Sequence, residues 1–177
     1  MVWITLFILV LPAFASTESW QLVYQPRQRV VRTIATYKNT IFIGTGNGVL
    51  LSKDFGKSWD DFSTDDLKKD LNGNSKINWI TIDKDKIYIA TSFGAYVSKI
   101  KKPKWENIFE DTKTESQEVN SITIDDGKIY LCTNDGLWLK ENNELKRFNT
   151  GLEPNIETGN YESLYATKIN ENLYLGT

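Results

Sequence analysis

The sequence predicts an all-β fold: a partial β-propeller with three four-stranded antiparallel blades, part of a fourth blade and an N-terminal closing strand. Four similar segments begin at residues 41, 87, 129 and 173, so 42 to 46 residues separate successive starts. Repeats of this length, each with four short strands, are typical of propeller blades. The 177 residues include 8 Tyr, 8 Phe and 6 Trp, which favour strands. Helical periodicity is almost absent.

The second repeat shows the expected strand order most clearly. Its first three strands are predicted at Ile77–Asp83, Lys86–Thr91 and Gly94–Lys99, and its outer strand at Lys104–Phe109. Asp, Asn, Lys and Gly separate the first two strands in each repeat, as tight hairpins require. A Thr followed three residues later by Gly marks the turn between the second and third strands. Each repeat is therefore expected to be a meander of four antiparallel strands.

The repeats divide residues 16–177 into one propeller domain. We expect blades at about 30–63, 77–110 and 118–149, and a partial blade at about 161–177. Residues 19–24 resemble an outer strand that would close the ring by completing a last blade, which would leave no open sheet edge. Because the fourth repeat stops in its second strand, we expect further blades beyond Thr177. One short helix is predicted at Thr64–Leu71, with Thr64 as its N-cap.

Residues 1–15 have the pattern of a secretory signal peptide. An apolar core too short to span a bilayer comfortably is followed by Ala13-Phe14-Ala15, a sequence suited to signal peptidase cleavage. No Lys or Arg precedes the apolar core, so either an incomplete N-terminus or a retained anchor helix stays open as an alternative. The pattern predicts a periplasmic or extracellular protein with no membrane contact beyond the signal peptide.

Composition excludes several kinds of chemistry. The chain has no His, which removes Ser-His-Asp and Cys-His catalysis and the usual zinc sites. The net charge of −2 argues against a nucleic-acid-binding face. Cys132, the single Cys, lies in an apolar strand and is expected to be a small core residue. No cofactor motif and no metal-binding loop is apparent, so we expect neither cofactor nor metal.

The stretch Ser52-Lys-Asp-Phe-Gly-Lys-Ser-Trp59 is expected to be a tight turn between two strands. An Asp side chain accepts hydrogen bonds from nearby backbone N–H groups, and Gly supplies a positive φ. The spacing Ser-x-Asp-x-Gly-x-Ser-Trp resembles the Asp-box, or BNR repeat, of sialidase-like propellers. That resemblance implies a structural turn without chemistry, formed by Ser52, Asp54, Gly56, Ser58 and Trp59.

A ligand face is predicted on the opposite side of the propeller from this turn. The long links between blades and the turns between second and third strands share that face, and loops raised on a rigid scaffold often bind ligands. The links are rich in acidic residues, including Asp70, and a set of solvated loops is the competing interpretation. The candidate ligand residues are Arg27, Arg29, Asn47, Phe93, Asn134 and Asp135.

The repeat also resembles photosystem II assembly factors, sortilin-like propellers and the periplasmic sensor propellers of two-component regulators. These resemblances imply an architecture more than an activity, because one propeller frame supports many functions. Our first hypothesis is an exported, non-catalytic binding or assembly module for a protein or carbohydrate ligand. The alternatives are the N-terminal part of a sialidase-like glycoside hydrolase, and a periplasmic ligand-sensing propeller.

Overall fold

The computed structural model describes residues 30–71, 76–109, 118–149, 153, 165–169 and 172–176. Within them the chain forms three four-stranded antiparallel sheets and one antiparallel pair, each in sequence order across the sheet. The first sheet comprises β1 (Val31–Tyr37), β2 (Thr40–Thr45), β3 (Gly48–Ser52) and β4 (Asp60–Asp61). The second comprises β5 (Ile77–Asp83), β6 (Lys86–Thr91), β7 (Gly94–Lys99) and β8 (Glu106–Asn107). The third comprises β9 (Val119–Asp125), β10 (Lys128–Thr133), β11 (Gly136–Glu141) and β12 (Glu144–Arg147), and the pair is β13 (Tyr165–Ile169) with β14 (Asn172–Gly176).

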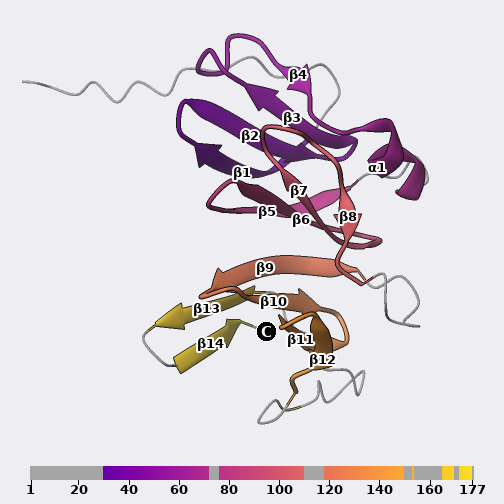
Figure 1. Cartoon of the computed structure of the whole chain (residues 1–177), viewed down its shortest axis with the longest axis vertical. Coiled ribbons are helices and arrows are strands. Elements are labelled where there is room, and N and C mark those ends of the chain that lie inside the picture. Colours follow the sequence, from indigo (N-terminus) through magenta and orange to yellow (C-terminus); the bar gives the residue numbers. More distant parts are fainter. Residues whose placement is uncertain are drawn as a thin grey trace, which may run out of the picture.

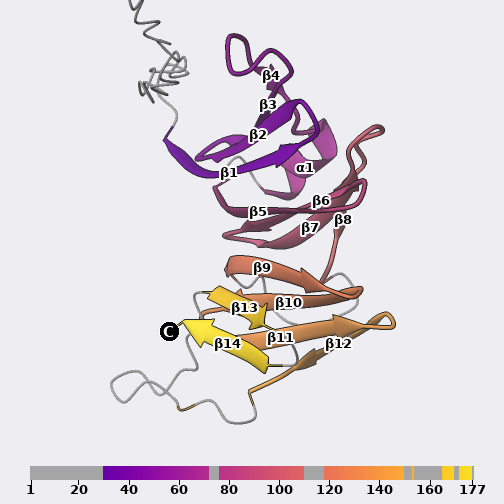
Figure 2. The same cartoon turned by 90° about the vertical axis from the view of Figure 1, so that its left-hand side faces the viewer.

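The four sheets follow one another face to face, as Figures 1 and 2 show from two directions. The first strands of successive sheets are neighbours: β5 lies against β1, β9 against β5, and β13 against β9. The first strand of each sheet is therefore the inner one, and the later strands lead outward. This arrangement is that of a partial β-propeller and confirms the predicted fold class.

The predicted strands of the second repeat are confirmed, with one difference. β5, β6 and β7 have the expected bounds, whereas the outer strand β8 covers only Glu106–Asn107. At its start the Lys104 N–H donates to the Ser98 hydroxyl, and at its end the Phe109 N–H donates to Asn107 Oδ1. The first of these bonds takes the place of a ladder bond at the start of the strand. Past its end the Ile108 N–H still donates to the Ala95 carbonyl oxygen, so backbone pairing continues one residue beyond Asn107. Residues 1–29, with the predicted signal peptide and closing strand, lie outside the described residues.

The core consists of apolar layers between successive sheets. Phe42, Val49 and Phe62 of the first sheet pack against Ile80 and Ile89 of the second. A second layer joins the second and third sheets around Ile122, Leu131 and Trp138. A third layer joins the third sheet to β13 and β14, and it contains Cys132 as the buried core residue that the sequence predicts. Each sheet is thus stabilised by its neighbours.

Helix α1 (Asp65–Asp70) fills the link between the first and second sheets, which confirms the predicted helix. The Leu67 N–H donates to the Thr64 hydroxyl at its N-terminus, and Asp65 and Asp66 favour the positive end of the helix dipole. Leu67 and Leu71 are completely buried in the layer between the two sheets. α1 therefore extends the core on the side of the links. In the part of the chain that the structure describes, no helix has the length and hydropathy needed to cross a membrane.

A pair of isoleucines at equivalent repeat positions tests the packing between sheets. Ile122 is 1% exposed and Ile34 is 65% exposed, because only Ile122 is covered by neighbouring strands of other sheets. We expect Ile122→Ala to lower the free energy of unfolding by about 2–5 kcal/mol, and Ile34→Ala to change it by about 0.5 kcal/mol. Urea titration of both variants measures the difference. Equal losses would contradict the layered core.

Candidate functional site

The turns between the second and third strands have the same geometry in three sheets. The hydroxyls of Thr45, Thr91 and Thr133 each donate to the carbonyl oxygen three residues on, at 2.9, 2.9 and 2.8 Å. Each hydroxyl oxygen also accepts the N–H of the residue two positions on, at 3.0 to 3.1 Å. The glycine that ends each turn has a φ between 103° and 120°, which explains the Thr-x-x-Gly pattern.

These turns hold Asn47, Phe93 and Asp135 at equivalent positions in the three blades, because each donates its N–H to the turn threonine. Three of the predicted ligand residues thus occupy the same turn position in the three four-stranded sheets. Asp135 forms an ion pair with Arg147, and Asn134 accepts a hydrogen bond from the Asn120 side chain at 2.9 Å. Arg27 and Arg29 lie outside the described residues. Of the predicted residues that the structure describes, Phe93 alone lines the cavity beside α1.

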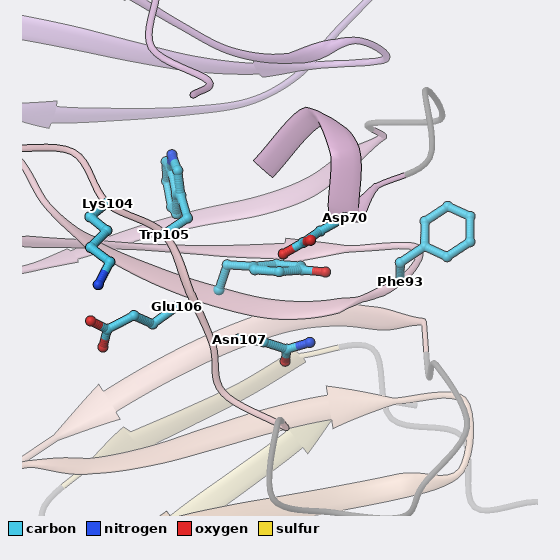
Figure 3. A pocket seen from close by; sticks show the side chains of 7 residues that line it. Asp70, Phe93, Lys104, Trp105, Glu106 and Asn107 are labelled. Carbon is cyan, nitrogen blue, oxygen red and sulfur yellow. The ribbon is translucent and has the colours of Figure 1, made fainter. Parts of the chain in front are cut away.

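A cavity of about 510 Å³ lies between α1 and the outer part of the second sheet. Figure 3 draws the side chains that line it and labels all but Tyr96: Phe93 lies at one end, Lys104 and Glu106 lie at the other, and Asp70 projects from the helix. Its volume is in the range of small-molecule sites in proteins. The seven lining residues are Asp70, Phe93, Tyr96, Lys104, Trp105, Glu106 and Asn107.

Tyr96 and Asp70 define the polar character of the cavity beside the helix. Burial and then the negative charge of Asp70 raise the pKa of Tyr96 to about 12. The phenol therefore stays neutral at physiological pH and can donate a hydrogen bond. A neutral donor near a carboxylate suits a ligand with both hydroxyl and amide groups.

Trp105 gives the cavity an apolar wall that is fixed by packing. Its ring meets Phe62 edge-to-face with centroids 5.9 Å apart, and Phe62 meets Phe42 in the same way at 5.2 Å. The buried Trp105 Nε1–H has no hydrogen-bond partner among the described residues. Trp59 Nε1 and Trp138 Nε1 share this property, so the unpartnered donor does not mark a ligand by itself. The ring is a rigid wall rather than an adaptable contact.

The end of the cavity near Lys104 and Glu106 continues into a basic flank. A neighbouring cavity of about 370 Å³ shares both residues and is also lined by Lys86, Lys99 and Lys102. The concentration of ammonium groups contrasts with the net charge of −2 for the whole chain. A ligand that extends from Phe93 toward Lys104 would pass from an aromatic end to a cationic end. Acidic substituents would be favoured at the second end.

The turn predicted from Ser52 to Trp59 is closed by side-chain hydrogen bonds. Asp54 accepts from the Ser58 hydroxyl at 2.6 Å, the Ser58 N–H at 2.9 Å and the Ser52 hydroxyl at 2.8 Å. Ser52 Oγ accepts the Gly56 N–H at 2.7 Å, and Gly56 has a φ of 87°. The equivalent turn in the third sheet has only Asn142 and Asn143, both with positive φ. One turn can therefore replace the other at this point of a blade.

Sequence reasoning missed most of the cavity. It treated Trp105, Glu106 and Asn107 as framework of an outer strand, and it assigned no role to Tyr96. The sequence feature that could have indicated the cavity is Trp105. A Trp next to a short polar strand, with a long acidic link following it in the sequence, is a place where a pocket can form. Among the described residues, no group of three His, Cys, Asp or Glu side chains gathers to hold a metal ion.

No family model matches the sequence, and no curated protein matches it significantly. Solved structures do resemble the chain. The extracellular domain of a B. thetaiotaomicron protein described as a hybrid two-component system matches with a TM-score of 0.63 and 17% identity, over 82% of this chain and 22% of that chain. The computationally designed Ika4 protein matches with a TM-score of 0.62 and 9% identity, over 86% and 88%. An ancestral GH74 enzyme matches with a TM-score of 0.50 and 18% identity, over 71% and 19%.

These likenesses concern the fold, because each identity is below one residue in five. They place the chain in the architectural class that its four sheets already define, a partial β-propeller. The chain spans 22% of the length of the extracellular domain and 19% of the length of the GH74 enzyme. The fold alone does not identify a function, because one propeller frame supports many functions.

Asp54 generates a prediction about pH. Hydrogen bonds from the Ser58 hydroxyl, the Ser58 N–H and the Ser52 hydroxyl lower the pKa of Asp54 from 3.8 to about 2. A lowered folded-state pKa adds stability above the unfolded pKa, and that stability is lost as the pH falls from 4 toward 2. We expect Asp54→Asn to unfold at a lower temperature at pH 7, and the difference from the native protein to shrink near pH 2. Thermal unfolding followed by circular dichroism measures both.

Phe55→Ala is the matched control for this experiment. Phe55 lies in the same turn and is 72% exposed. Its side chain takes no part in the hydrogen bonds to Asp54, so its pH profile should follow that of the native protein. A constant gap between Asp54→Asn and the native protein from pH 7 to pH 2 would refute the ionic account of the turn.

Proposed function

We propose that this chain is an exported, non-catalytic propeller module that binds a carbohydrate in the cavity beside α1. The observation that supports this function best is the set of groups around that cavity. The half-buried Phe93 offers aromatic surface and the largely buried Trp105 ring forms a wall, while Asp70, Tyr96 and Asn107 supply acceptors and donors around a volume of about 510 Å³. Sugar rings present apolar C–H faces and many hydroxyls, and such a mixture of groups satisfies both.

The Ser52–Trp59 turn has a structural role in this proposal. Its hydrogen bonds are satisfied within the turn itself, with Asp54 accepting from both Ser52 and Ser58. It leaves the first sheet on the side opposite the links, away from Phe93. We assign it to the Asp-box type of turn, which braces the outer strands. Export is proposed from the leader pattern at residues 1–15, which also favours a ligand found outside the cytoplasm.

A sensor role is a variant of the same function. One structural neighbour is described as the extracellular domain of a hybrid two-component system. A ligand-sensing propeller would use the cavity in the same way and would differ only in what the bound ligand controls. The binding experiment below therefore applies to both.

Binding is tested by isothermal titration with a panel of neutral and acidic oligosaccharides. For a glycan that binds, we expect Phe93→Ala to raise the Kd about tenfold, or roughly 1.4 kcal/mol, because an aromatic contact is lost. The control is Phe55→Ala, which removes an exposed ring on the opposite side. Absence of binding across the panel, or equal effects of the two variants, would contradict carbohydrate binding at this cavity.

A glycoside hydrolase of the sialidase type is the second candidate. The observation in its favour is that two carboxylates, Asp70 and Glu106, line one cavity together with Tyr96. Most glycosidases use a pair of carboxylates, whereas sialidases use a Tyr as the nucleophile. If the protein is a hydrolase, Asp70→Asn and Glu106→Gln should each lower kcat on a fluorogenic sialoside by at least roughly a hundredfold. Our first proposal expects no turnover by the native protein. Turnover that either variant abolishes would replace binding by catalysis.

A further inference from the structure

A second cavity of about 420 Å³ lies among the inner strands β5, β9 and β13, away from the site beside α1. Its residues come from successive blades at equivalent positions, with Thr81, Thr123 and Thr167 forming one such set. The Thr123 hydroxyl donates to the Ala166 carbonyl oxygen and ties β9 to β13. The cavity is therefore a product of the radial arrangement of blades, on the side of the inner strands.

Two aromatic residues give this cavity its character. Trp79 and Tyr165 occupy the same repeat position in the second and fourth blades, where the first and third blades have the small residues Thr33 and Ser121. Their ring centroids are 6.5 Å apart with an interplanar angle of 54°. Trp79 is 36% exposed and Tyr165 is 55% exposed. Large rings that meet at an angle and stay partly open to solvent form two walls of a cage.

The backbone makes room for the Tyr165 ring. Gly176 is the ladder partner of Tyr165 in the β13–β14 pair. A Cβ atom at Gly176 would stand 2.7 Å from Tyr165 Cδ2, so any larger residue would displace the ring. The ring therefore lies across the glycine, as aromatic side chains do when they cover a strand glycine. The second wall of the cage is held in place by this contact.

The charge of the cavity indicates what it would hold. Among the described residues that line it, Asp83 is the only one with a formal charge. Lys86 is the ladder partner of Asp83, but it does not line the cavity and forms no ion pair with Asp83. Aromatic faces carry negative electrostatic potential, which a carboxylate reinforces. The cavity thus favours a positive charge, in contrast to the lysine-rich flank on the outer side of the second sheet.

We propose that this inner-strand cavity binds an organic cation of the quaternary or methylated ammonium type. Trp79 and Tyr165 supply cation–π contacts, and Asp83 supplies the compensating charge. A methylated ammonium suits the site because it is weakly hydrated, offers apolar methyl groups to the rings and needs no strong acceptor at short range. The threonines leave room for a hydroxyl on the same ligand.

The experiment is a titration of the purified protein with choline and with 3,3-dimethylbutan-1-ol, its neutral isostere of the same shape. We expect choline to bind and the neutral alcohol to bind at least tenfold more weakly. Trp79→Leu and Tyr165→Leu should each raise the choline Kd by about 3- to 30-fold, whereas Tyr165→Phe keeps the ring and should change it less than twofold. Asp83→Asn and Gly176→Ala should weaken binding as well.

Thermal unfolding of every variant serves as the folding control. If a leucine variant does not fold, the choline Kd of Tyr165→Phe still tests the proposal, because this variant keeps the aromatic ring. Phe93→Ala, in the other cavity, should leave the choline Kd unchanged, so this proposal and the carbohydrate proposal can fail separately. Equal binding of choline and the neutral alcohol would show a merely apolar pocket and overturn the proposal. So would a large loss of binding in Tyr165→Phe, or binding of a sugar and not of choline.

Discussion

The structure depends on the burial of each sheet's two apolar faces against its neighbours. Ile80, Ile122 and Ala166 occupy equivalent positions on inner strands and are all nearly inaccessible to solvent, whereas Ile34 at the same position of the first sheet is largely exposed. The sequence at this position is almost the same in every repeat, so the difference in burial comes from the neighbours alone. No sheet of this size is stable by itself with two apolar faces in water. Radial stacking is the arrangement that covers both faces of every inner sheet.

Stacking also determines which parts of a blade can vary. The Thr-x-x-Gly turn recurs with the same two hydrogen bonds in three blades, because both its threonine and its glycine are buried between strands. The residue just before the glycine donates only its backbone N–H to the turn threonine. Its side chain can therefore change from Asn47 to Phe93 to Asp135 while the hydrogen bonds of the turn stay the same. The outer turn is less constrained still. An eight-residue turn around Asp54 in one blade is replaced by Asn142 and Asn143 in another.

The fold could be predicted because its signal is periodic along the chain. Strand bounds of β5, β6 and β7, the helix α1 and the burial of Cys132 all follow from local pattern and turn chemistry. The sites could not be predicted in the same way. Trp79 and Tyr165 are far apart in sequence and become neighbours only because two blades flank a third. Tyr96 and Asp70 likewise meet only because α1 folds back over the second sheet, and no local pattern encodes that contact.

Departures from the repeat are therefore the most informative positions in this chain. A position that only stacks blades together should hold similar residues in every repeat, as the series Phe42, Tyr88 and Tyr130 does on the second strands. At the position of Trp79, by contrast, the residue alternates between small and large, and the two large ones come together at the inner strands. At the position of Phe93 an aromatic ring stands among Asn and Asp. Packing requires neither change, since the blades with Thr33 and Ser121 at the first position are stacked too. Both cavities thus lie where residues depart from the repeat, and both involve the second blade. Its inner strand β5 lines the cavity with Trp79, and its outer strand β8 lines the cavity beside α1.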